Sequence, residues 1–339
     1  MKPLLRVGSA FAAIAIFVAS AHFVRTNSNV AADYPRATIT ASSSEVEIDI
    51  SKGATGSDIA QLLYENGVVK SPQAAFRTFV ADPRSARIAP GVHRITQRIS
   101  AAQALEQLLD VKRMPNVITI FEGEWNSEVI STLVKGGYSR ADVVRALRLA
   151  KLPEGFTSTE GLLFPAHYSF PTGTPIQDII QKMVDRAVVE LRSSRILKGD
   201  GRYTPVQLLT MASMVQQEGD LSNLGKVAQV LRNRLHIGMR LQFDSTVHYI
   251  TGIRGNIFLS TKSTLLKSPY NTYQRYGLPP TPIGNPGRAA MDAVMNPTPG
   301  NWLYFITVKP GETRFTDSLD EFNRWKIEYR KNLKAGAFS

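Results

Sequence analysis

One glutamate occupies a position where a carboxylate is expected to be costly. Glu218 follows Met211, Met214 and Val215 at helical spacings, so it extends the apolar face of a helix. Apolar surroundings and the negative end of a helix both raise the pKa of a carboxyl group. A carboxyl that stays protonated near neutral pH can act as a general acid on a glycosidic bond. The pattern also fits a salt-bridged glutamate, or one that reaches solvent beyond the helix end.

Signals for helix ends surround this glutamate. Thr204 and Pro205 combine a capping side chain with a proline suited to the first helical position. Gly219 follows Glu218 directly and can end the helix. The apolar spacing predicts a second helix over residues 224–236.

A second carboxylate comes after these helices. Residues 240–249 mix polar and apolar side chains in a pattern that indicates a strand or a loop. Asp244 lies within this segment and is a candidate partner for Glu218. A cap or turn aspartate that accepts hydrogen bonds from the backbone fits the same pattern.

Two loops with suitable side chains for a ligand follow. Residues 268–273 contain two tyrosines and an asparagine, and residues 277–287 are too rich in Pro and Gly for regular structure. Aromatic faces and amides suit the apolar faces and hydroxyl edges of sugar rings. They suit many other ligands too, so the loops alone decide nothing.

The elements that must position these residues indicate an α+β protein. Alternating and helical spacings predict the following elements: strands at 45–50, 92–95, 116–121 and 301–308, the last buried, and helices at 59–67, from 72, at 101–109 and over 175–197. We expect the small module within residues 45–110 to bind rather than to catalyse, because nothing in it resembles a reactive group.

The N-terminal segment favours export. Residues 7–24 carry almost no charge and follow Lys2 and Arg6, as expected for a membrane helix with a cytoplasmic N-terminus. A cleaved signal peptide is the alternative, since Ala19–Ala21 fits a small-residue cleavage pattern. Residues 25–44 are polar and read as a linker.

Composition excludes several kinds of site. The 339 residues include no cysteine, which removes disulfides, thiol catalysis and cysteine-bound zinc. None of the five histidines is spaced like a metal ligand, so we expect neither metal nor cofactor. The net charge of +12 favours anionic neighbours, such as membrane headgroups or acidic polymers. We expect no nucleic-acid partner, because no dense Lys/Arg run or basic-aromatic patch is present.

The ordered set of motifs over residues 45–330 resembles the YceG-like family, the MltG-type endolytic murein transglycosylases. The densest match is Leu209–Glu218. The others are Asn233–Leu235, Gly238–Met239, Leu241–Gln242, Asp244, Thr246–Val247, Tyr270–Tyr273, Gly277–Pro280, Ile283, Asn285–Gly287 and Leu303–Phe305.

The resemblance implies a fold and an organisation. It indicates an α+β protein with a cytoplasmic tail, a transmembrane helix, a linker, a small LysM-like subdomain and a larger lysozyme-like catalytic domain. In this sequence these parts correspond to residues 1–6, 7–24, 25–44, 45–112 and 113–335. The protein would thus be single-pass in the bacterial cell membrane, with its catalytic part outside the cytoplasm.

The resemblance also implies an activity. The enzyme would cut the β-1,4 bond between N-acetylmuramic acid and N-acetylglucosamine within nascent glycan strands. It would leave 1,6-anhydro ends and terminate elongation alongside peptidoglycan synthases. Glu218 matches the catalytic acid. The residues that we predict to orient the sugar or support the acid are Asn233, Gln242, Asp244, Tyr270, Asn271 and Tyr273.

Two departures from the family pattern bear on this prediction. The family usually has a second glutamate where this chain has Gln216, so a neighbouring charge able to tune Glu218 is lost. It commonly has Asp and Thr at the positions of Ala166 and His167. Glu160 and Tyr168, which match the family, are interpreted as mainly structural.

Two other functions remain open at this point. A hydrolytic muramidase would need a second carboxylate facing Glu218, for which Asp244 is the candidate. A non-catalytic scaffold that binds peptidoglycan would explain the small module without requiring the acid. A DNA-binding membrane protein would explain the charge but none of the motifs.

Overall fold

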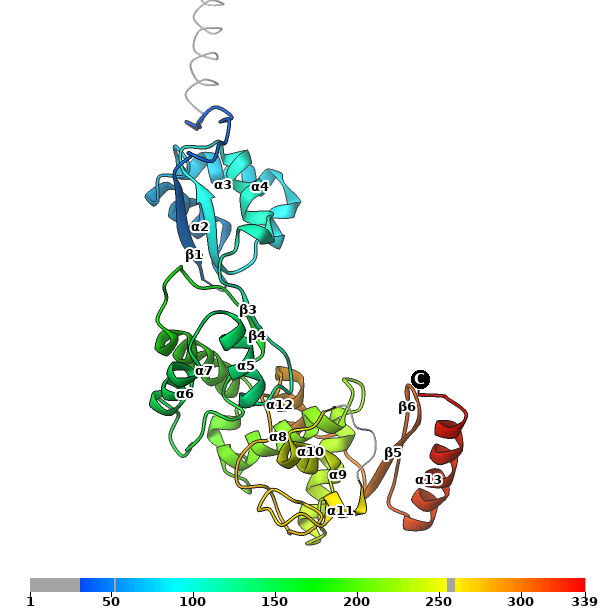
Figure 1. Cartoon of the computed structure of the whole chain (residues 1–339). Helices are drawn as coiled ribbons and strands as arrows, with labels where there is room; N and C mark the ends of the chain where they lie inside the picture. The colour runs from blue at the N-terminus through cyan, green and yellow to red at the C-terminus, as the bar shows by residue number, and fades with distance from the viewer. Residues whose placement is uncertain (1–30, 52, 255–259, 339) are drawn as a thin grey trace, which may run out of the picture. The chain divides into compact units, whose positions relative to one another are not determined.

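The computed structural model describes residues 31–51, 53–254 and 260–338. The chain divides into two compact units, which are described separately below (Figure 1). Unit 1 contains residues up to Val117 together with Tyr168–Gly173, and unit 2 contains Ile118–His167 and the chain from Thr174 onward. The predicted membrane segment 7–24 lies outside the described residues. Within the described residues, no helix combines the length and apolarity that a membrane span requires.

Unit 1 is a small α+β module. Its strands form an antiparallel pair in which Glu45 faces Thr96 and Ile50 faces Gly91. Side chains of Thr55, Ser71 and Ser100 cap the three helices. The elements are β1 (Glu45–Ile50), α2 (Gly56–Glu65), α3 (Pro72–Ala81), β2 (Gly91–Thr96) and α4 (Ala101–Leu109).

The apolar residues that predicted these elements form the core of unit 1. The buried cluster includes Ile48 and Ile50 of β1, Leu63 of α2, and Leu105 and Leu108 of α4. The apolar residues of the alternating strands and of the periodic helices thus form one hydrophobic core. Each element that the sequence predicted here is present.

Unit 2 is mostly helical. Its helices and strands are β3 (Ile118–Ile120), α5 (Asn126–Lys135), α6 (Arg140–Leu149), β4 (Ala166–Tyr168), α7 (Ile176–Ser193), α8 (Pro205–Glu218), α9 (Leu224–His236), α10 (Asp244–Thr251), α11 (Thr261–Thr264), α12 (Arg288–Met295), β5 (Tyr304–Lys309), β6 (Glu312–Thr316) and α13 (Leu319–Lys334). Strand β3 pairs with β4, and β5 pairs with β6. The last residue of β4, Tyr168, falls in unit 1.

Helix α8 is the central element of unit 2. Its residues from Leu208 to Val215 are all buried, and it contacts α9, α10 and α12 (Figure 1). A helix that is apolar all round belongs inside a protein rather than at its surface. Thr204 caps it and Pro205 occupies its first position, as the sequence predicted. The core of unit 2 therefore fixes the direction in which the end of α8 points.

The prediction for residues 240–249 was wrong in part. Residues from Asp244 to Thr251 form helix α10, not a strand or loop. Gly252 ends it with a φ of 67°, which glycine adopts without strain. Thr246 and Val247 are β-branched, and only a short apolar face contacts α8, so the pattern resembles a strand.

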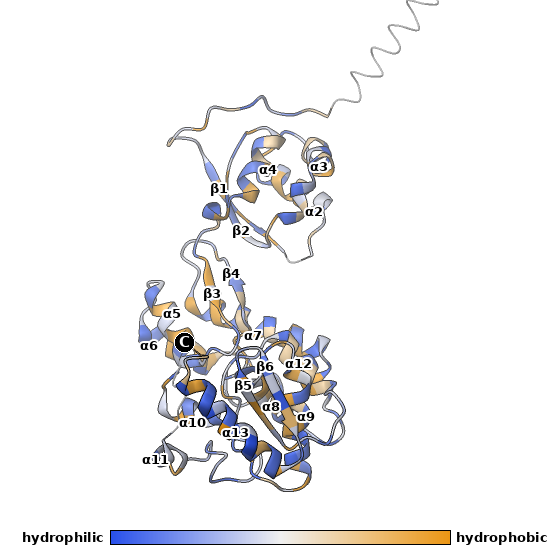
Figure 2. Cartoon of the chain, turned by 90° about the vertical axis from the view of Figure 1, so that its right-hand side faces the viewer, coloured by the Kyte–Doolittle hydropathy of each residue, from blue (hydrophilic) through white to orange (hydrophobic). Residues whose placement is uncertain are grey.

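The segment 301–308 forms a strand but not a buried one. Of the six residues of β5, only Val308 is buried. Strand β5 pairs with β6 alone and is contacted by α13 (Figure 2). Helix α13 has no buried residue and is largely hydrophilic in Figure 2. Helix α9 also contacts β5, yet these helices leave most residues of the strand partly exposed.

Candidate active site

Glu218 is the last residue of α8, and its side chain is half-buried. The buried turns before it hold the helix, while the helix end brings the carboxyl to the wall of a cavity. This acid cavity has a volume of about 280 Å³. Its lining residues are Trp125, Gln217, Glu218, Asp244, Ser245, His248 and Arg254.

The Glu218 carboxyl lies between two helix ends of opposite polarity. It terminates α8, where carbonyl groups disfavour negative charge, and its Oε1 accepts a 3.0 Å hydrogen bond from the backbone N–H of Ser245. Ser245 is in the first turn of α10, where free N–H groups favour negative charge. The surroundings therefore partly stabilise both the protonated and the ionised form of Glu218.

Burial determines the direction in which the pKa of Glu218 is shifted. Loss of contact with water raises the pKa of the carboxyl, and the negative charge of Asp244 adds to the rise. The backbone hydrogen bond from Ser245 and the positive charge of Arg234 act in the opposite direction but do not cancel the rise in the pKa. The acid is thus held in the protonated form at higher pH than an ordinary glutamate, as the sequence predicted.

Asp244 and Tyr273 form a pair beside the acid. The Tyr273 hydroxyl donates to Oδ1 of Asp244, the first residue of α10. Burial and the charges of Asp244 and Glu218 raise the pKa of Tyr273, so its hydroxyl keeps its proton. Both predicted residues therefore lie close to Glu218.

Arg234 is a buried cation whose charge acts on Glu218. It is buried, and its guanidinium donates to the carbonyl groups of Leu303, at 2.7 Å, and Leu241. Burial lowers the pKa of Arg234, while the charge of Glu218 counteracts that effect. Arg234 falls within the Asn233–Leu235 motif, but it was not predicted as a site residue, because spacing does not distinguish it from the two polar residues before it on α9.

Three other predicted residues make structural contacts or face solvent. Asn233 donates to the carbonyl groups of Gly300 and Trp302, at 3.0 and 2.9 Å. Asn271 is fully buried, and its amide donates to the carbonyl groups of Thr264, the last residue of α11, and Leu266. Gln242 is exposed, with a φ of 51°. None of the three lines the acid cavity.

Tyr270 lies in a neighbouring cavity rather than beside the acid. That second cavity has a volume of about 400 Å³. It is lined by Trp125, Ser127, Glu160, Tyr249, Ile250, Gly252, Ser268 and Tyr270. Trp125 belongs to the walls of both cavities.

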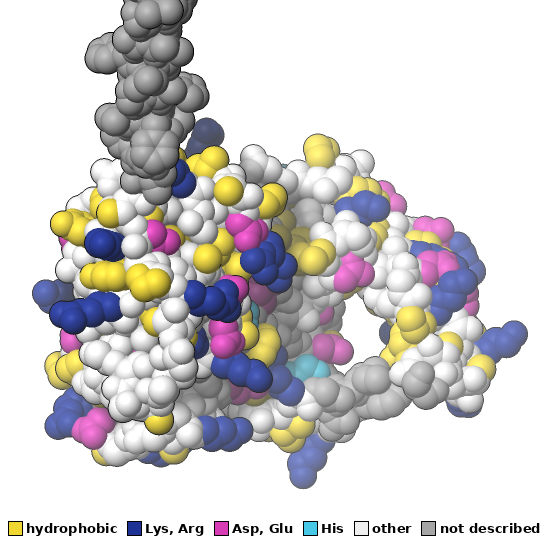
Figure 3. All heavy atoms as spheres, turned by 90° about the horizontal axis from the view of Figure 1, so that it is seen from above, with side chains coloured by type: hydrophobic (Ala, Val, Ile, Leu, Met, Phe, Trp, Pro, Cys, Tyr) yellow, Lys and Arg dark blue, Asp and Glu magenta, His cyan; other side chains and the backbone are white. Residues whose placement is uncertain are grey.

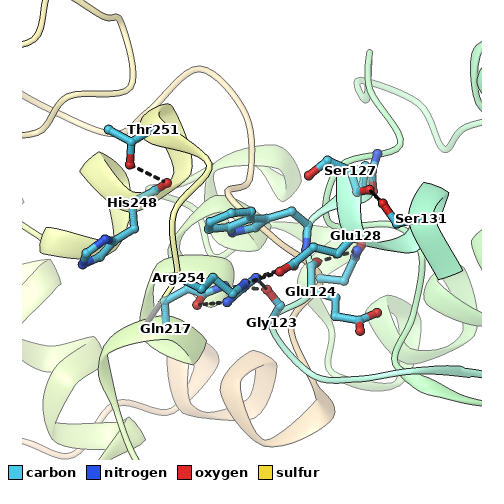
Figure 4. A network of polar contacts seen from close by, with 12 residues as sticks. Gly123, Glu124, Ser127, Glu128, Ser131, Gln217, His248, Thr251 and Arg254 are labelled. Carbon is cyan, nitrogen blue, oxygen red and sulfur yellow. Dashed lines mark hydrogen bonds and ion pairs between the residues drawn. The ribbon is translucent and has the colours of Figure 1, made fainter. Parts of the chain in front are cut away.

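Arg254 and Trp125 line the acid cavity and were missed by sequence reasoning. Arg254 donates to both Glu128 oxygens, at 2.5 and 2.7 Å, and to Gln217 at 3.1 Å, and Figure 4 shows it between these side chains. Its guanidinium also lies 4.0 Å from the centroid of the Trp125 ring. These contacts tie the loop before α5 to the end of α8. No local pattern in the sequence marks such a long-range contact.

Gln216 has a structural partner. Its Oε1 accepts a 2.9 Å hydrogen bond from the backbone N–H of Gly287. The glutamine therefore anchors the Pro/Gly-rich loop against α8, a role that needs an acceptor oxygen but no charge.

Comparison with known proteins identifies the family. The model of the YceG-like family matches residues 48–328. The chain belongs to this family. An endolytic murein transglycosylase of Bacillus subtilis (strain 168) is 31% identical over 312 residues, which cover 85% of this chain and 86% of that protein.

Two further YceG-like family comparisons agree with this result. An endolytic murein transglycosylase of Streptococcus pneumoniae (strain D39) is 33% identical over 176 residues, or 50% of this chain and 32% of that protein. The crystal structure of a yceG-like protein from Listeria monocytogenes matches with a TM-score of 0.57 and 25% identity, covering 83% of this chain and 98% of that one. The α+β architecture of this chain is thus similar to that of a solved yceG-like protein.

The described part of the chain holds no cluster that resembles a metal centre. Among these residues, no group of three or more His, Cys, Asp or Glu side chains is arranged to hold a metal ion. The carboxyl groups on the wall of the acid cavity are those of Glu218 and Asp244.

Proposed function

We propose that this protein is an endolytic murein transglycosylase that cuts β-1,4 bonds between N-acetylmuramic acid and N-acetylglucosamine within peptidoglycan strands. The observation that carries the proposal is Glu218, a carboxyl with a raised pKa on the wall of a cavity. Membership of the YceG-like family and the B. subtilis relative support the same activity.

In the proposed reaction one carboxyl acts twice. Protonated Glu218 donates its proton to the leaving glycosidic oxygen as the bond to C1 breaks. The resulting carboxylate then takes the proton of the muramyl C6 hydroxyl, whose oxygen attacks C1 of the same sugar. The 1,6-anhydro ring forms without a bound water, because the nucleophile belongs to the substrate. Glu218 ends the cycle protonated.

The neighbours of Glu218 suit this double role. Burial favours the acid that starts the reaction, and the Ser245 N–H stabilises the carboxylate that follows. Asp244 is held by Tyr273, and its negative charge opposes early loss of the proton from Glu218. We assign Asp244 and Tyr273 a positioning and electrostatic role.

A hydrolytic muramidase is the second candidate function, and one observation favours it. Asp244 lines the acid cavity with Glu218, so a carboxylate is available to activate water. The products separate the two functions, because hydrolysis leaves a reducing end and transglycosylation leaves an anhydro ring. A glycan-binding scaffold would leave neither.

The test is mass spectrometry of purified peptidoglycan digested by the chain and by its Glu218→Gln variant. We expect anhydro-muramyl ends whose rate of formation falls by at least about 10² to 10⁴ in the variant, because the amide cannot donate and retake the proton. Glu154→Gln, which changes an exposed glutamate, should leave the rate unchanged. Reducing ends would establish the muramidase, and glycan binding without cleavage would establish the scaffold.

The remaining parts of the chain fit a membrane-tethered enzyme. We propose that residues 7–24 anchor it in the bacterial cell membrane, with residues 25–44 as a linker and the catalytic part outside the cytoplasm. The β1–α2–α3–β2 order of unit 1 supports a LysM-like glycan-binding role. Such an enzyme would terminate nascent strands beside peptidoglycan synthases.

A further inference from the structure

The second cavity is large enough for a ligand and adjoins the acid cavity. Its volume of about 400 Å³ lies within the range of about 300–1,000 Å³ typical of ligand pockets. Helix α10 contributes Asp244, Ser245 and His248 to the acid cavity, and Tyr249 and Ile250 to the second. One helix and one Trp125 ring therefore form walls of both cavities, and a continuous polymer can occupy them together.

Three aromatic rings form one wall of the second cavity. Tyr249 lies between Trp125 and Tyr270, with ring centroids 5.9 and 5.2 Å away. The Tyr270 hydroxyl is fixed to Thr281 at 2.9 Å, and that of Tyr249 to Glu160 at 3.2 Å. Rings held in this way lose little entropy on binding and offer apolar faces to the C–H groups of a sugar.

Glu160 supplies a buried polar group to the same cavity. Only 7% of Glu160 is exposed, and its carboxyl accepts hydrogen bonds from the Asn126 N–H at 3.1 Å and from Tyr249. No ion pair within residues 31–51, 53–254 and 260–338 neutralises it. A carboxyl has more acceptor sites than these two bonds use, so it can accept from a ligand as well.

A polar side-chain atom near Glu160 lacks a hydrogen-bond partner among the described residues. Asn126 donates through its side-chain amide to Thr159 at 2.9 Å. Its side-chain oxygen is buried, yet it has no hydrogen-bond partner among the described residues. Asn126 lies between Trp125 and Ser127, which both line the second cavity, but Asn126 is not itself part of the lining, so its unpaired oxygen marks a polar region behind the cavity wall.

We infer that the second cavity is a saccharide subsite that binds another N-acetylated hexosamine of the strand cleaved at Glu218. The sugar ring packs against Tyr249 and Tyr270, with the largely buried Trp125 behind them, and its hydroxyl or acetamido N–H donates to Glu160. This inference rests on the proposed function. Such a subsite would make the enzyme prefer long strands, because it binds one more sugar than the two on either side of the cleaved bond.

The chemistry of the cavity favours sugar over stem peptide. Aromatic faces with a few fixed hydrogen-bonding groups match a neutral ring with many hydroxyls. Stem peptides carry carboxylates, and the described residues that line the second cavity include no lysine or arginine to pair with them. Peptide binding is nonetheless a separate outcome of the test below.

The test blocks the second cavity without changing the acid. Ser127 lies on its rim, is exposed, and is in the first turn of α5, so Ser127→Trp should fill the entrance. Ser131→Trp is the matched control, because Ser131 is also exposed and lies one turn further along α5, outside the lining (Figure 4). Both are made in the Glu218→Gln background, so that glycans bind without being cut.

The measurement is the affinity for peptide-free glycans of two, four, six and eight sugars. We expect affinity to rise with length for the background and for Ser131→Trp, and the Ser127→Trp affinity for the longest glycan to be at least tenfold lower. Ser127→Leu should give a smaller change in the same direction. An unchanged length dependence in Ser127→Trp, or an equal loss in Ser131→Trp, overturns the subsite.

Two further outcomes are informative. If length dependence requires stem peptides on the glycan, the second cavity binds peptide and the saccharide subsite is wrong. The proposed function is judged separately, by anhydro ends released from whole peptidoglycan by the chain with Glu218 intact. Either idea can therefore fail while the other stands.

Discussion

At the scale of single residues, the site depends on carboxyl groups placed where charge is costly. Glu218 was predicted because its position on an apolar helix face is visible in the sequence. Glu160, a match to the family, was interpreted as mainly structural. The segment around it has no periodicity that reveals burial. The structure encloses both carboxyls and raises the pKa of both. Local pattern thus identifies a buried acid only when a regular element carries it.

Replacing Glu160 with Gln is expected to flatten the pH dependence of stability. Burial raises the Glu160 pKa from its ordinary value of 4.5 to about 7. Between these values the native state binds more protons than the unfolded state, so the free energy of unfolding falls as pH rises from 4.5 to 7. The whole effect amounts to about 3 kcal/mol. Urea denaturation at several pH values measures it.

Two features make this measurement specific to Glu160. Glu154→Gln removes an exposed carboxyl from the same segment and should keep the slope of the parent chain. The Glu160→Gln chain also loses a constant amount of stability, since the amide NH2 group replaces one of the two carboxyl oxygens that accept from Asn126 and Tyr249. An unchanged slope in Glu160→Gln would show that Glu160 does not retain a proton in the native state.

At the scale of elements, long periodic helices were predictable and the loops that join them were not. Helices α7, α8 and α9 were predicted because their apolar stripes are long. The short α10 was predicted as strand or loop, although it supplies Asp244 and Ser245 to the acid cavity. The loop positions of Trp125 and Arg254 depend on side-chain contacts between distant segments, which no local spacing encodes.

Asn285 shows how one buried side chain joins such segments. Its Oδ1 accepts from Leu163 N–H at 2.9 Å and its Nδ2 donates to the Glu124 carbonyl at 2.8 Å. Its own backbone bonds the same loop, with Gly123 N–H donating to its carbonyl at 2.7 Å. The Pro/Gly-rich loop, the loop before α5 and the segment after Glu160 are thereby held together.

We expect Asn285→Ala to lower the free energy of unfolding by about 2 to 3 kcal/mol, because it leaves a buried backbone N–H without an acceptor. Asn296→Ala is the matched control, since Asn296 is exposed and makes a single 3.3 Å side-chain bond to the Asp292 carbonyl. Its change should stay within about 0.5 kcal/mol. Chemical denaturation of both variants measures the difference, and equal losses would contradict the role given to Asn285.

At the scale of the whole molecule, charge and the N-terminal segment both favour a membrane surface, for different reasons. The net charge of +12 attracts anionic headgroups, and Figure 3 shows Lys and Arg dispersed among acidic and uncharged side chains on the visible face. That attraction acts through water and is screened by salt. Insertion of residues 7–24 would depend on apolar burial and would resist salt. Salt therefore separates the two contributions.

The tether is tested by expressing the full chain and a chain that starts at residue 31, with an unrelated signal peptide to export the shorter one. We expect the full chain to stay in the membrane fraction through a wash in 1 M salt, where the screening length falls to about 3 Å, and to keep the mass of an uncleaved chain. The shorter chain should be released. A full chain that salt releases is held by charge alone, and a mass that begins after Ala21 means a cleaved signal peptide, so either result contradicts the anchor.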